Sequence, residues 1–433
     1  MSIALTAVVL FAVFFFLLAL SVPISVSIVI AAAVTGLTSL NLDQVSFIVM
    51  QKMNTGVESF SLLAVPLFIL AGNIMNNGGI ARRIINFAQL FCGFIPGSLA
   101  QTNVLGNMFF GALAGSGVAA ASAMGGSIAP IQKEEKYDMA FATAVNIASA
   151  PTGLLIPPTS AFIVYSSVVG GVSISALFMA GYVPGILMGL GVMAVAFLYA
   201  KAHKYPTTGV VPLKTVIKVT LDAIPSFLLI IIVIGGIVGG VFTATEGAGV
   251  CVLYCLLLSM AYRSITFKQF FRILVDSACV SGIILFLISA SAAMSWVIAY
   301  SGIPDAIASG LLSISENKYV IFFMVNLILL IVGMFLDITP AILIFTPIFL
   351  PICMSLGMDP VHFGVMLIFN MCIGSMTPPV GSVLFVGCGI TKCSIERVSV
   401  MLVPYFLVLI AILLLITYVP SISLFIPEMM GLM

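Results

Sequence analysis

The segment GSLAQTNVLGNMFFGALAGSGVAAASAMGGSIAPI, residues 97–131, is long enough for two short helices and is interrupted near its middle by Gly111, Gly115, Ser116 and Gly117. A re-entrant helix hairpin fits this pattern better than one continuous membrane span. After the charged link KEEKYD, the apolar stretch 139–171 is interrupted by PTGLLIPPTS at 151–160. Three prolines and a glycine cannot sustain a helix there, so we expect a broken helix.

The composition indicates a membrane protein. Of the 433 residues, 62% are hydrophobic and 7% are charged, and the mean hydropathy is +1.31. Such a chain has too few polar groups to cover a water-facing surface, so its expected surroundings are a lipid bilayer. The formal net charge of +1 provides no basic face for nucleic acid, and no such partner is expected. The first apolar segment, 3–20, lacks a basic n-region, which favours a retained span over a signal peptide.

The order of segments occurs twice along the chain. In the first half, spans are expected near 3–20, 22–40, 59–77 and 175–200, around the hairpin 97–131 and the broken helix 139–171. In the second half, spans are expected near 222–241, 246–262, 276–300 and 399–418. There the second hairpin is 319–352, and the second broken helix is 361–390 with its interruption at SMTPPVGS, 375–382.

Matching dipeptides recur at a nearly constant shift. Pro157-Pro158 and Pro378-Pro379 are 221 residues apart, as are Pro130-Ile131 and Pro351-Ile352, while Gly79-Ile80 and Gly302-Ile303 are 223 apart. Internal duplication explains three matches in order. We therefore expect a first repeat at 1–205, a cytoplasmic linker at 206–221 and a second repeat at 222–433.

Five spans and one re-entrant hairpin per repeat make an odd number of crossings, so the second repeat should be inverted relative to the first. The expected fold is an all-α polytopic membrane protein with two inverted repeats. Short cytoplasmic loops are enriched in Lys and Arg. With both termini periplasmic, all 15 Lys and Arg except Lys52 and Lys318 lie on the cytoplasmic side.

The hairpin tips and helix breaks are the expected functional site, because lipid cannot satisfy non-helical backbone and only protein or a polar ligand can. Freed carbonyls can coordinate a cation such as Na⁺, and helix N-termini can hold an anion. The candidates in the first half are Ser116, Gly117, Asn146, Ser149, Thr152, Gly153 and Thr159. Those in the second half are Gly333, Asp337, Thr339, Asn370, Gly374, Ser375, Thr377 and Val380, with Gly374 and Val380 acting through their carbonyls.

Structural explanations exist for several of these residues. Small residues also serve simply to let membrane helices pack closely. Asp337 is costly in an apolar segment unless it is paired or binds an ion, although a hairpin tip that reaches water would also explain it. Glu246 in FTATEGAG is expected at the start of a span, where an acid stabilises a helix N-terminus.

Other functional classes find little support. An intramembrane enzyme needs a nucleophile and base or metal ligands at depth, whereas the sequence offers one deep Asp and no intramembrane His. An enzyme is therefore not expected. An ion channel usually assembles a ring of like residues, and the sequence suggests no such ring.

Six blocks of this sequence, spread over nearly its whole length and in the same order, resemble the large membrane subunit, or DctM type, of tripartite ATP-independent periplasmic (TRAP) transporters. The blocks are SFSLLAVPLFILAGNIMNNGGIARRI (59–84), GALAGSGVAAASAMG (111–125), GLLIPPTSAFIVYS (153–166), FTATEGAGVCVLY (242–254), GMFLDITPAILIFTPIFLPI (333–352) and GSMTPPVGSVLFV (374–386). One departure is Ala244, where the family usually has proline.

The resemblance implies a Na⁺-driven importer of acidic organic solutes in the bacterial inner membrane. It implies two partners, a small four-helix membrane subunit and a periplasmic binding protein, and an elevator-type fold with scaffold and transport domains. Two or more transported Na⁺ ions are implied at Ser116, Ser149, Thr152, Gly153, Pro157, Gly333, Asp337, Gly374, Thr377 and Val380. The residues expected to contact the solute are Ser116, Gly117, Asn146, Thr159, Thr339, Asn370 and Ser375.

The solute itself stays open at this stage. Members of the family carry C4-dicarboxylates, sialic acid, sugar acids or keto acids, and the sequence does not choose among them. A Na⁺/dicarboxylate symporter that needs no binding protein is the alternative function.

Overall fold

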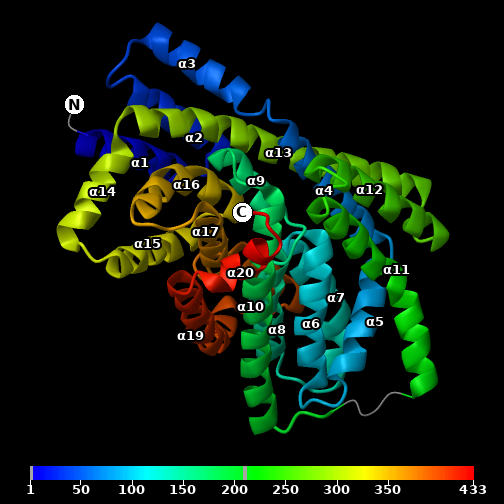
Figure 1. The fold of residues 1–433 in the computed structure, drawn as a ribbon. Helices are drawn as coiled ribbons and strands as arrows, with labels where there is room; N and C mark the ends of the chain where they lie inside the picture. Colours follow the sequence, from blue (N-terminus) through cyan, green and yellow to red (C-terminus); the bar gives the residue numbers. More distant parts are fainter. Residues whose placement is uncertain (1–2, 208–211) are drawn as a thin grey trace.

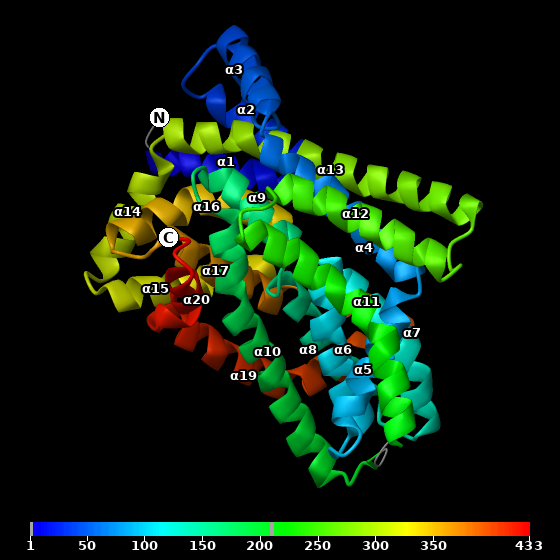
Figure 2. The same ribbon diagram turned by 45° about the vertical axis from the view of Figure 1, so that its right-hand side comes forward.

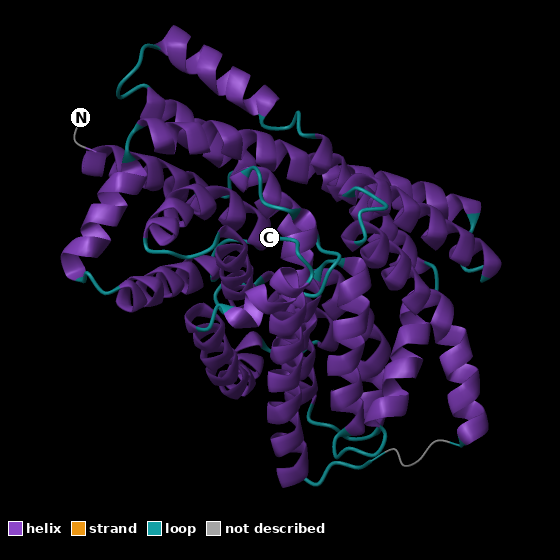
Figure 3. Cartoon of the chain, in the orientation of Figure 1, coloured by secondary structure: helices purple, strands orange, loops and turns teal. Residues whose placement is uncertain are grey.

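The computed structural model describes residues 3–207 and 212–433, and within these ranges the chain is helical with no strand (Figures 1 and 3). Seven helices in the described ranges are long and apolar enough to cross a membrane, at 60–77, 174–202, 213–238, 244–261, 267–300, 338–355 and 395–418. Shorter apolar helices make up most of the remainder. These observations confirm the expected all-α polytopic membrane class.

One group of helices forms a long layer along one side of the molecule. It contains α1 (Ile3–Ala19), α2 (Ile24–Gly36), α3 (Leu42–Thr55), α4 (Ala64–Asn77), α11 (Leu213–Val238), α12 (Ala244–Ala261) and α13 (Phe267–Tyr300). The 34-residue α13 is the central element, because α2, α3 and α4 all pack on it (Figures 1 and 2). We call this group the scaffold layer.

The other group holds the predicted hairpins and broken helices. Its first part contains α6 (Ser98–Ala114), α7 (Gly117–Glu134), α8 (Met139–Ser149), the 3₁₀ turn η2 (Ala150–Leu154), α9 (Ser160–Val169) and α10 (Ile174–Ala202). Its second part contains α15 (Lys318–Gly333), α16 (Ile338–Ser355), α17 (Pro360–Gly374), α18 (Ser382–Thr391), α19 (Ile395–Tyr418) and α20 (Ser421–Met429). The two parts interlock, since α7 packs on α18 and α10 packs on α17 and α19. We call this group the hairpin unit.

Two short helices connect the scaffold layer to the hairpin unit. α5 (Ile80–Cys92) packs on both α6 and α11, and α14 (Ile303–Ile314) packs on both α1 and α16. Each begins after a glycine in the left-handed region, Gly79 at φ 73° and Gly302 at φ 66°, where a side chain would strain the turn. Arg83 ties α5 to the scaffold layer, because its Nε lies 3.2 Å from an Asp222 carboxylate oxygen on α11.

The structure corrects several expected boundaries. α3 occupies a segment for which no element was expected, because its polar residues hide an amphipathic helix from a search for long apolar runs. α13 begins at Phe267 and not near 276, since its first turns carry Lys268, Arg272 and Asp276. α11 begins at Leu213, inside the expected linker 206–221, of which residues 208–211 lie outside the described residues.

The expectation for Glu246 is confirmed. Thr243 caps α12, and the Glu246 side chain completes a capping box, with the Thr243 N–H donating to Glu246 Oε2 at 2.8 Å and the Glu246 N–H donating to Thr243 Oγ1 at 3.2 Å. These bonds satisfy backbone donors that the helix itself cannot.

Replacing Thr243 by valine should therefore destabilise the protein by about 1 kcal/mol, because the cap is lost while the side chain keeps its shape. The midpoint of unfolding in a denaturing detergent series measures this effect. Ser309→Ala, on the exposed surface of α14, is the matched control and should stay within about 0.5 kcal/mol of wild type. Equal midpoints for Thr243→Val and wild type would show that the cap does not limit stability.

Candidate functional site

The first hairpin turns at Gly115 and Ser116, between α6 and α7. Gly115 has φ 60°, and the Ser116 hydroxyl accepts a hydrogen bond from the Ala119 N–H at 3.3 Å as the cap of α7. The first break leaves α8 after Ser149, passes through η2 and resumes at Ser160, where Thr159 caps α9. The hairpin tip and the start of α9 meet, because a Cβ on Gly115 would lie 3.0 Å from the Pro158 carbonyl oxygen.

The second hairpin turns at residues 334–337, and Asp337 precedes α16. The Asp337 side chain does not cap α16 and instead accepts a hydrogen bond from the Ser382 hydroxyl at 3.2 Å. The second break runs from Ser375 to Gly381. It is bonded to the hairpin through the backbone, since the Val380 N–H donates to the Met334 carbonyl at 3.2 Å.

In each half, a glycine of the hairpin lies against a glycine of the break. A Cβ on Gly153 would collide with the backbone of Gly111, and a Cβ on Gly374 would collide with the backbone of Gly333. Gly333 follows Gly111 by 222 residues, and Gly374 follows Gly153 by 221. The same close backbone approach therefore occurs in both halves at the shift seen in the sequence.

A cavity of about 510 Å³ lies where the two hairpins and the two breaks come together. Four helix N-termini reach it through capping or first-turn residues, which are Ser116 and Gly117 of α7, Ser160 of α9, Asp337 and Thr339 of α16, and Ser382 of α18. Among the described residues that line the cavity, none is lysine or arginine, and Asp337 is the one charged side chain. Helix N-termini therefore supply the positive potential of this cavity.

The scaffold layer closes the cavity on its remaining side. Asn73 and Asn76 of α4 line it, together with Val280 and Ile284 of α13. The Asn73 amide donates to the Ser277 hydroxyl at 2.8 Å, which ties α4 to α13 beside the cavity. Any solute bound here thus contacts both the hairpin unit and the scaffold layer.

The candidates from the sequence fall into two sets. The structure brings Ser116, Gly117, Asp337, Thr339 and Ser375 together around the cavity. The others are not among the residues that line this cavity: Asn146, Ser149, Thr152, Gly153, Pro157, Thr159, Gly333, Asn370, Gly374, Thr377 and Val380.

Sequence reasoning also missed several lining residues. Ser122 lies between one and two turns after the first hairpin tip, and Ser160 and Ser382 lie at the ends of the breaks. Asn73 lies in an apolar span. A polar amide within such a span indicates a functional site, so the sequence contained a signal for Asn73.

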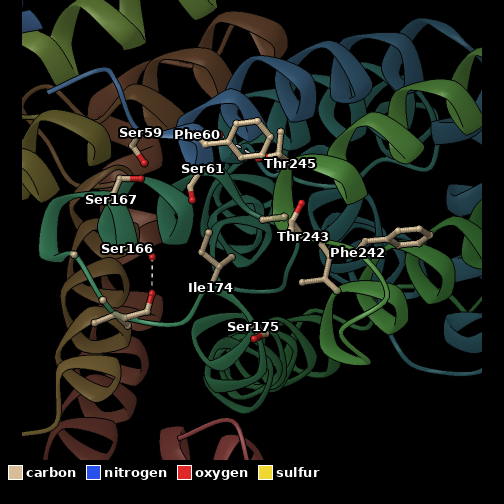
Figure 4. A pocket seen from close by; sticks show the side chains of 15 residues that line it. Ser59, Phe60, Ser61, Ser166, Ser167, Ile174, Ser175, Phe242, Thr243 and Thr245 are labelled. Atoms are coloured by element: carbon tan, nitrogen blue, oxygen red, sulfur yellow. Dashed lines mark hydrogen bonds between the residues drawn. The ribbon is translucent and has the colours of Figure 1, made fainter. Parts of the chain in front are cut away.

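A second cavity, of about 440 Å³, lies at the N-terminal end of α4 (Figure 4). Seven hydroxyl side chains line it: Ser59, Ser61, Ser166, Ser167, Ser175, Thr243 and Thr245. They come from Ser59 and the 3₁₀ turn η1 (Phe60–Leu63) that precedes α4, from the corner between α9 and α10, and from the start of α12, so this cavity also lies between the hairpin unit and the scaffold layer. This cavity contacts residues 59–61 before α4, whereas the first cavity contacts residues 68–76 within α4.

The fold defines a polytopic helical membrane protein with a cavity at converging helix N-termini, and sequence comparison gives its family. The family model for the DctM component of the tripartite ATP-independent periplasmic transporters matches residues 11–422. This chain belongs to that family. It is a transporter subunit and not an enzyme.

Three curated relatives are similar over nearly all of this chain, and two of them are named as TRAP transporter permeases. The uncharacterized protein YgiK of Salmonella typhimurium is 51% identical, over 98% of this chain and 97% of the relative. The isethionate TRAP transporter permease protein DctMQ of Oleidesulfovibrio alaskensis is 37% identical, over 96% of this chain and 66% of the relative. The C4-dicarboxylate TRAP transporter large permease protein DctM of Rhodobacter capsulatus is 33% identical, over 99% of this chain and all of the relative.

A solved structure has a similar fold. The YdaH transporter of Alcanivorax borkumensis superposes with a TM-score of 0.60 at 14% identity, over 87% of this chain and 89% of that chain. At this identity the likeness concerns the fold alone.

Adding a methyl group at either glycine contact should loosen the join between hairpin and break. We expect Gly153→Ala and Gly374→Ala each to destabilise the protein by about 1–3 kcal/mol, the usual cost of overpacking. Thermal unfolding in mild detergent measures this change. Gly126→Ala is the control, because a Cβ there meets nothing within 4 Å and alanine favours a helix. Wild-type stability of both contact variants would contradict the predicted close approach.

Proposed function

We propose that this chain is the large membrane subunit of a Na⁺-coupled importer that carries a small organic anion across the bacterial inner membrane. The observation that carries this proposal is the convergence of four helix N-termini on one cavity whose described lining has no lysine or arginine. Backbone N–H groups and helix dipoles bind anions there without a permanent cationic side chain. A carrier benefits from this arrangement, because a solute held only by dipoles can also be released.

The Asp337 carboxylate supports coupling to a cation. It lies in the same cavity as the four N-termini. Among the residues that the structure describes, no lysine or arginine forms an ion pair with it. An anionic solute entering beside this carboxylate would be repelled unless a cation neutralised it. A Na⁺ ion held near Asp337 by oxygen ligands of the second hairpin and break removes that repulsion, so solute and ion bind together. We propose two or more such ions. One lies near Asp337 and another near the contact of Gly111 with Gly153, in agreement with the proposed repeat.

An inverted repeat and an elevator movement complete the proposal. The repeated glycine contact supports the expected repeats at 1–205 and 222–433, each with five spans and one re-entrant hairpin. α5 and α14 link the two groups, and each follows a glycine in the left-handed region, so they suit flexible arms. One cavity before the start of α4 and another along α4 suit a hairpin unit that slides along the scaffold layer and exposes the site to each side in turn.

The relatives guide the choice of solute and partners. Their names mention isethionate and C4-dicarboxylate, both small organic anions. C4-dicarboxylates, sialic acid, and sugar or keto acids thus remain the solutes to test, with isethionate added. The relative named DctMQ, of which this chain matches 66%, supports a small membrane subunit as the first partner. The family description supports a periplasmic binding protein as the second partner. We further propose that both termini of this chain lie on the periplasmic side, because this orientation places most Lys and Arg on the cytoplasmic side.

Uptake into proteoliposomes tests the function directly. The chain and its small subunit would be reconstituted with an inward Na⁺ gradient and offered radiolabelled isethionate, succinate, sialic acid and sugar acids, with and without the binding protein. We expect uptake that needs both Na⁺ and the binding protein. Na⁺-dependent uptake without the binding protein would support the alternative, an ordinary Na⁺/dicarboxylate symporter. Uptake that is indifferent to Na⁺ would refute cation coupling.

Neutralising Asp337 should weaken the response to Na⁺ without preventing assembly. We expect Asp337→Asn to raise the Na⁺ concentration for half-maximal uptake roughly tenfold, because a charge-assisted contact to the ion is lost. The measurement is initial uptake against Na⁺ at constant ionic strength, with size-exclusion elution as the assembly check. Asp305→Asn, in the first turn of α14, is the control. An assembled Asp337→Asn variant with unchanged Na⁺ dependence would make Asp337 structural.

A further inference from the structure

Buried asparagines join the first hairpin to the first broken helix, behind the cavity lining. Asn107 of α6 is fully buried, and its amide nitrogen lies 2.7 Å from Ser149 Oγ and 3.1 Å from Asn146 Oδ1. The same nitrogen lies 3.0 Å from Asn103 Oδ1 and 3.3 Å from the Asn146 carbonyl oxygen. Asn146 in turn donates to the Ala121 carbonyl of α7 at 2.9 Å. One network therefore connects both arms of the hairpin to the last turn of α8.

The second half contains the corresponding pair. Asn370 of α17 is fully buried and donates to Asn326 Oδ1 of α15 at 2.6 Å. Asn326 donates to Thr417 Oγ1 of α19 at 3.0 Å. Asn326 follows Asn103 by 223 residues, and Asn370 follows Asn146 by 224, close to the shift of the glycine contacts. Asn326 is thus the counterpart of Asn103, whose Oδ1 accepts from Asn107, while Asn107 makes the corresponding bond to the helix before the first break. The first hairpin arm and the helix before the break are thus joined by asparagine amides in both halves.

The position of these amides explains their use. Ser149 is the last residue of α8, and Asn370 lies one turn before the end of α17 at Gly374. In the last turn of any helix the carbonyls lose their intrahelical partners, so the end is free to fray or shift. Side chains that bond this turn from a neighbouring helix hold its end in place. Buried amides are costly unless bonded, so their recurrence at both breaks calls for a reason beyond packing.

We infer that Asn107 and Asn326 are positioning residues, which hold the last turn before each break at the distance from its hairpin that the cation and solute sites require. The inference rests on the proposed function, because it concerns how that site is preorganised. Neither residue lines the cavity, so each acts through Asn146 and Ser149 or through Asn370. Without these bonds, Na⁺ binding would have to order the break. The free energy of that ordering would be subtracted from the binding free energy, so the affinity for Na⁺ would fall.

The partial positive charge on the amide hydrogens of Asn107 allows an experiment to distinguish a positioning role from direct binding of a cation. The Asn107 NH₂ group carries two hydrogens, which are shared among the oxygens of Asn103, Asn146 and Ser149 and place partial positive charge where a cation would otherwise sit. Aspartate at this position keeps the shape but replaces the donor by an oxygen. The positioning role therefore predicts that Asn107→Asp weakens Na⁺ binding, whereas a cation site formed by these oxygens predicts that it strengthens Na⁺ binding.

The test uses Na⁺ alone on the purified full chain, so it does not depend on knowing the solute. Thermal unfolding is followed while Na⁺ replaces choline at constant ionic strength, and the Na⁺ concentration for half of the stabilisation is read for each variant. We expect Asn107→Leu, Asn326→Leu and Asn107→Asp to raise this concentration roughly tenfold, the equivalent of one or two lost buried hydrogen bonds. Asn107→Ser, which is smaller and retains a hydroxyl donor, should fall between wild type and Asn107→Leu, and it serves if the leucine variant does not fold.

Gln101→Leu is the matched control. Gln101 is a buried amide on the same helix as Asn107, but it donates to the Met193 carbonyl of α10 at 3.0 Å and not to a break. It should lower the unfolding temperature without Na⁺ and leave the half-saturating Na⁺ concentration unchanged. The inference is overturned if the asparagine variants behave like Gln101→Leu, or if Asn107→Asp binds Na⁺ more tightly. Wild type without any Na⁺-specific stabilisation would overturn the Na⁺ coupling of the proposed function and the inference with it.

Discussion

The rest of the structure depends on one constraint, which is that backbone N–H and C=O groups at membrane depth must find partners inside the protein. The chain leaves the helical ladder at two hairpin tips and two breaks, and hydrogen bonds join hairpin and broken helix in both halves. The Val380 N–H donates to the Met334 carbonyl, and the Asn146 side-chain amide of α8 donates to the Ala121 carbonyl of α7. Such contacts need backbones to approach closely, which the glycine pairs Gly111 with Gly153 and Gly333 with Gly374 allow. A break is therefore stable only together with its hairpin.

The pairing of hairpins with breaks also determines the electrostatic potential of the cavity. Each interruption ends one helix and starts another, so two hairpins and two breaks create four new N-termini. All four reach one cavity, where their partial positive charges are concentrated opposite the single carboxylate of Asp337. The cavity can thus attract an anion and a cation in neighbouring places without a buried salt bridge. The same feature that satisfies the backbone supplies the chemistry on which cotransport would rely.

Prediction from sequence succeeded where local chemistry decides the outcome. Glycine and proline clusters located both hairpins and both breaks to within a few residues, because those residues end helices whatever surrounds them. Hydropathy placed α13 too late and overlooked α3, because it detects apolar runs and not amphipathic or charged first turns. Among the predicted site residues, Ser116 and Asp337 line the cavity, whereas Asn146 and Asn370 face the hairpin arms. Proximity to a break in sequence does not say which face of a helix a side chain occupies.

The sequence by itself determined the membrane class, the interruptions and the family, because hydrophobicity, helix breakers and ordered sequence blocks are properties of neighbouring residues. Only the tertiary structure decided that four helix N-termini meet at one cavity, that α4 closes it with Asn73 and Asn76, and that Asn107 and Asn326 bond the helix ends before the breaks. These contacts join residues that lie from about 40 to more than 200 positions apart. They follow from how helices pack against one another, and no local pattern encodes that packing.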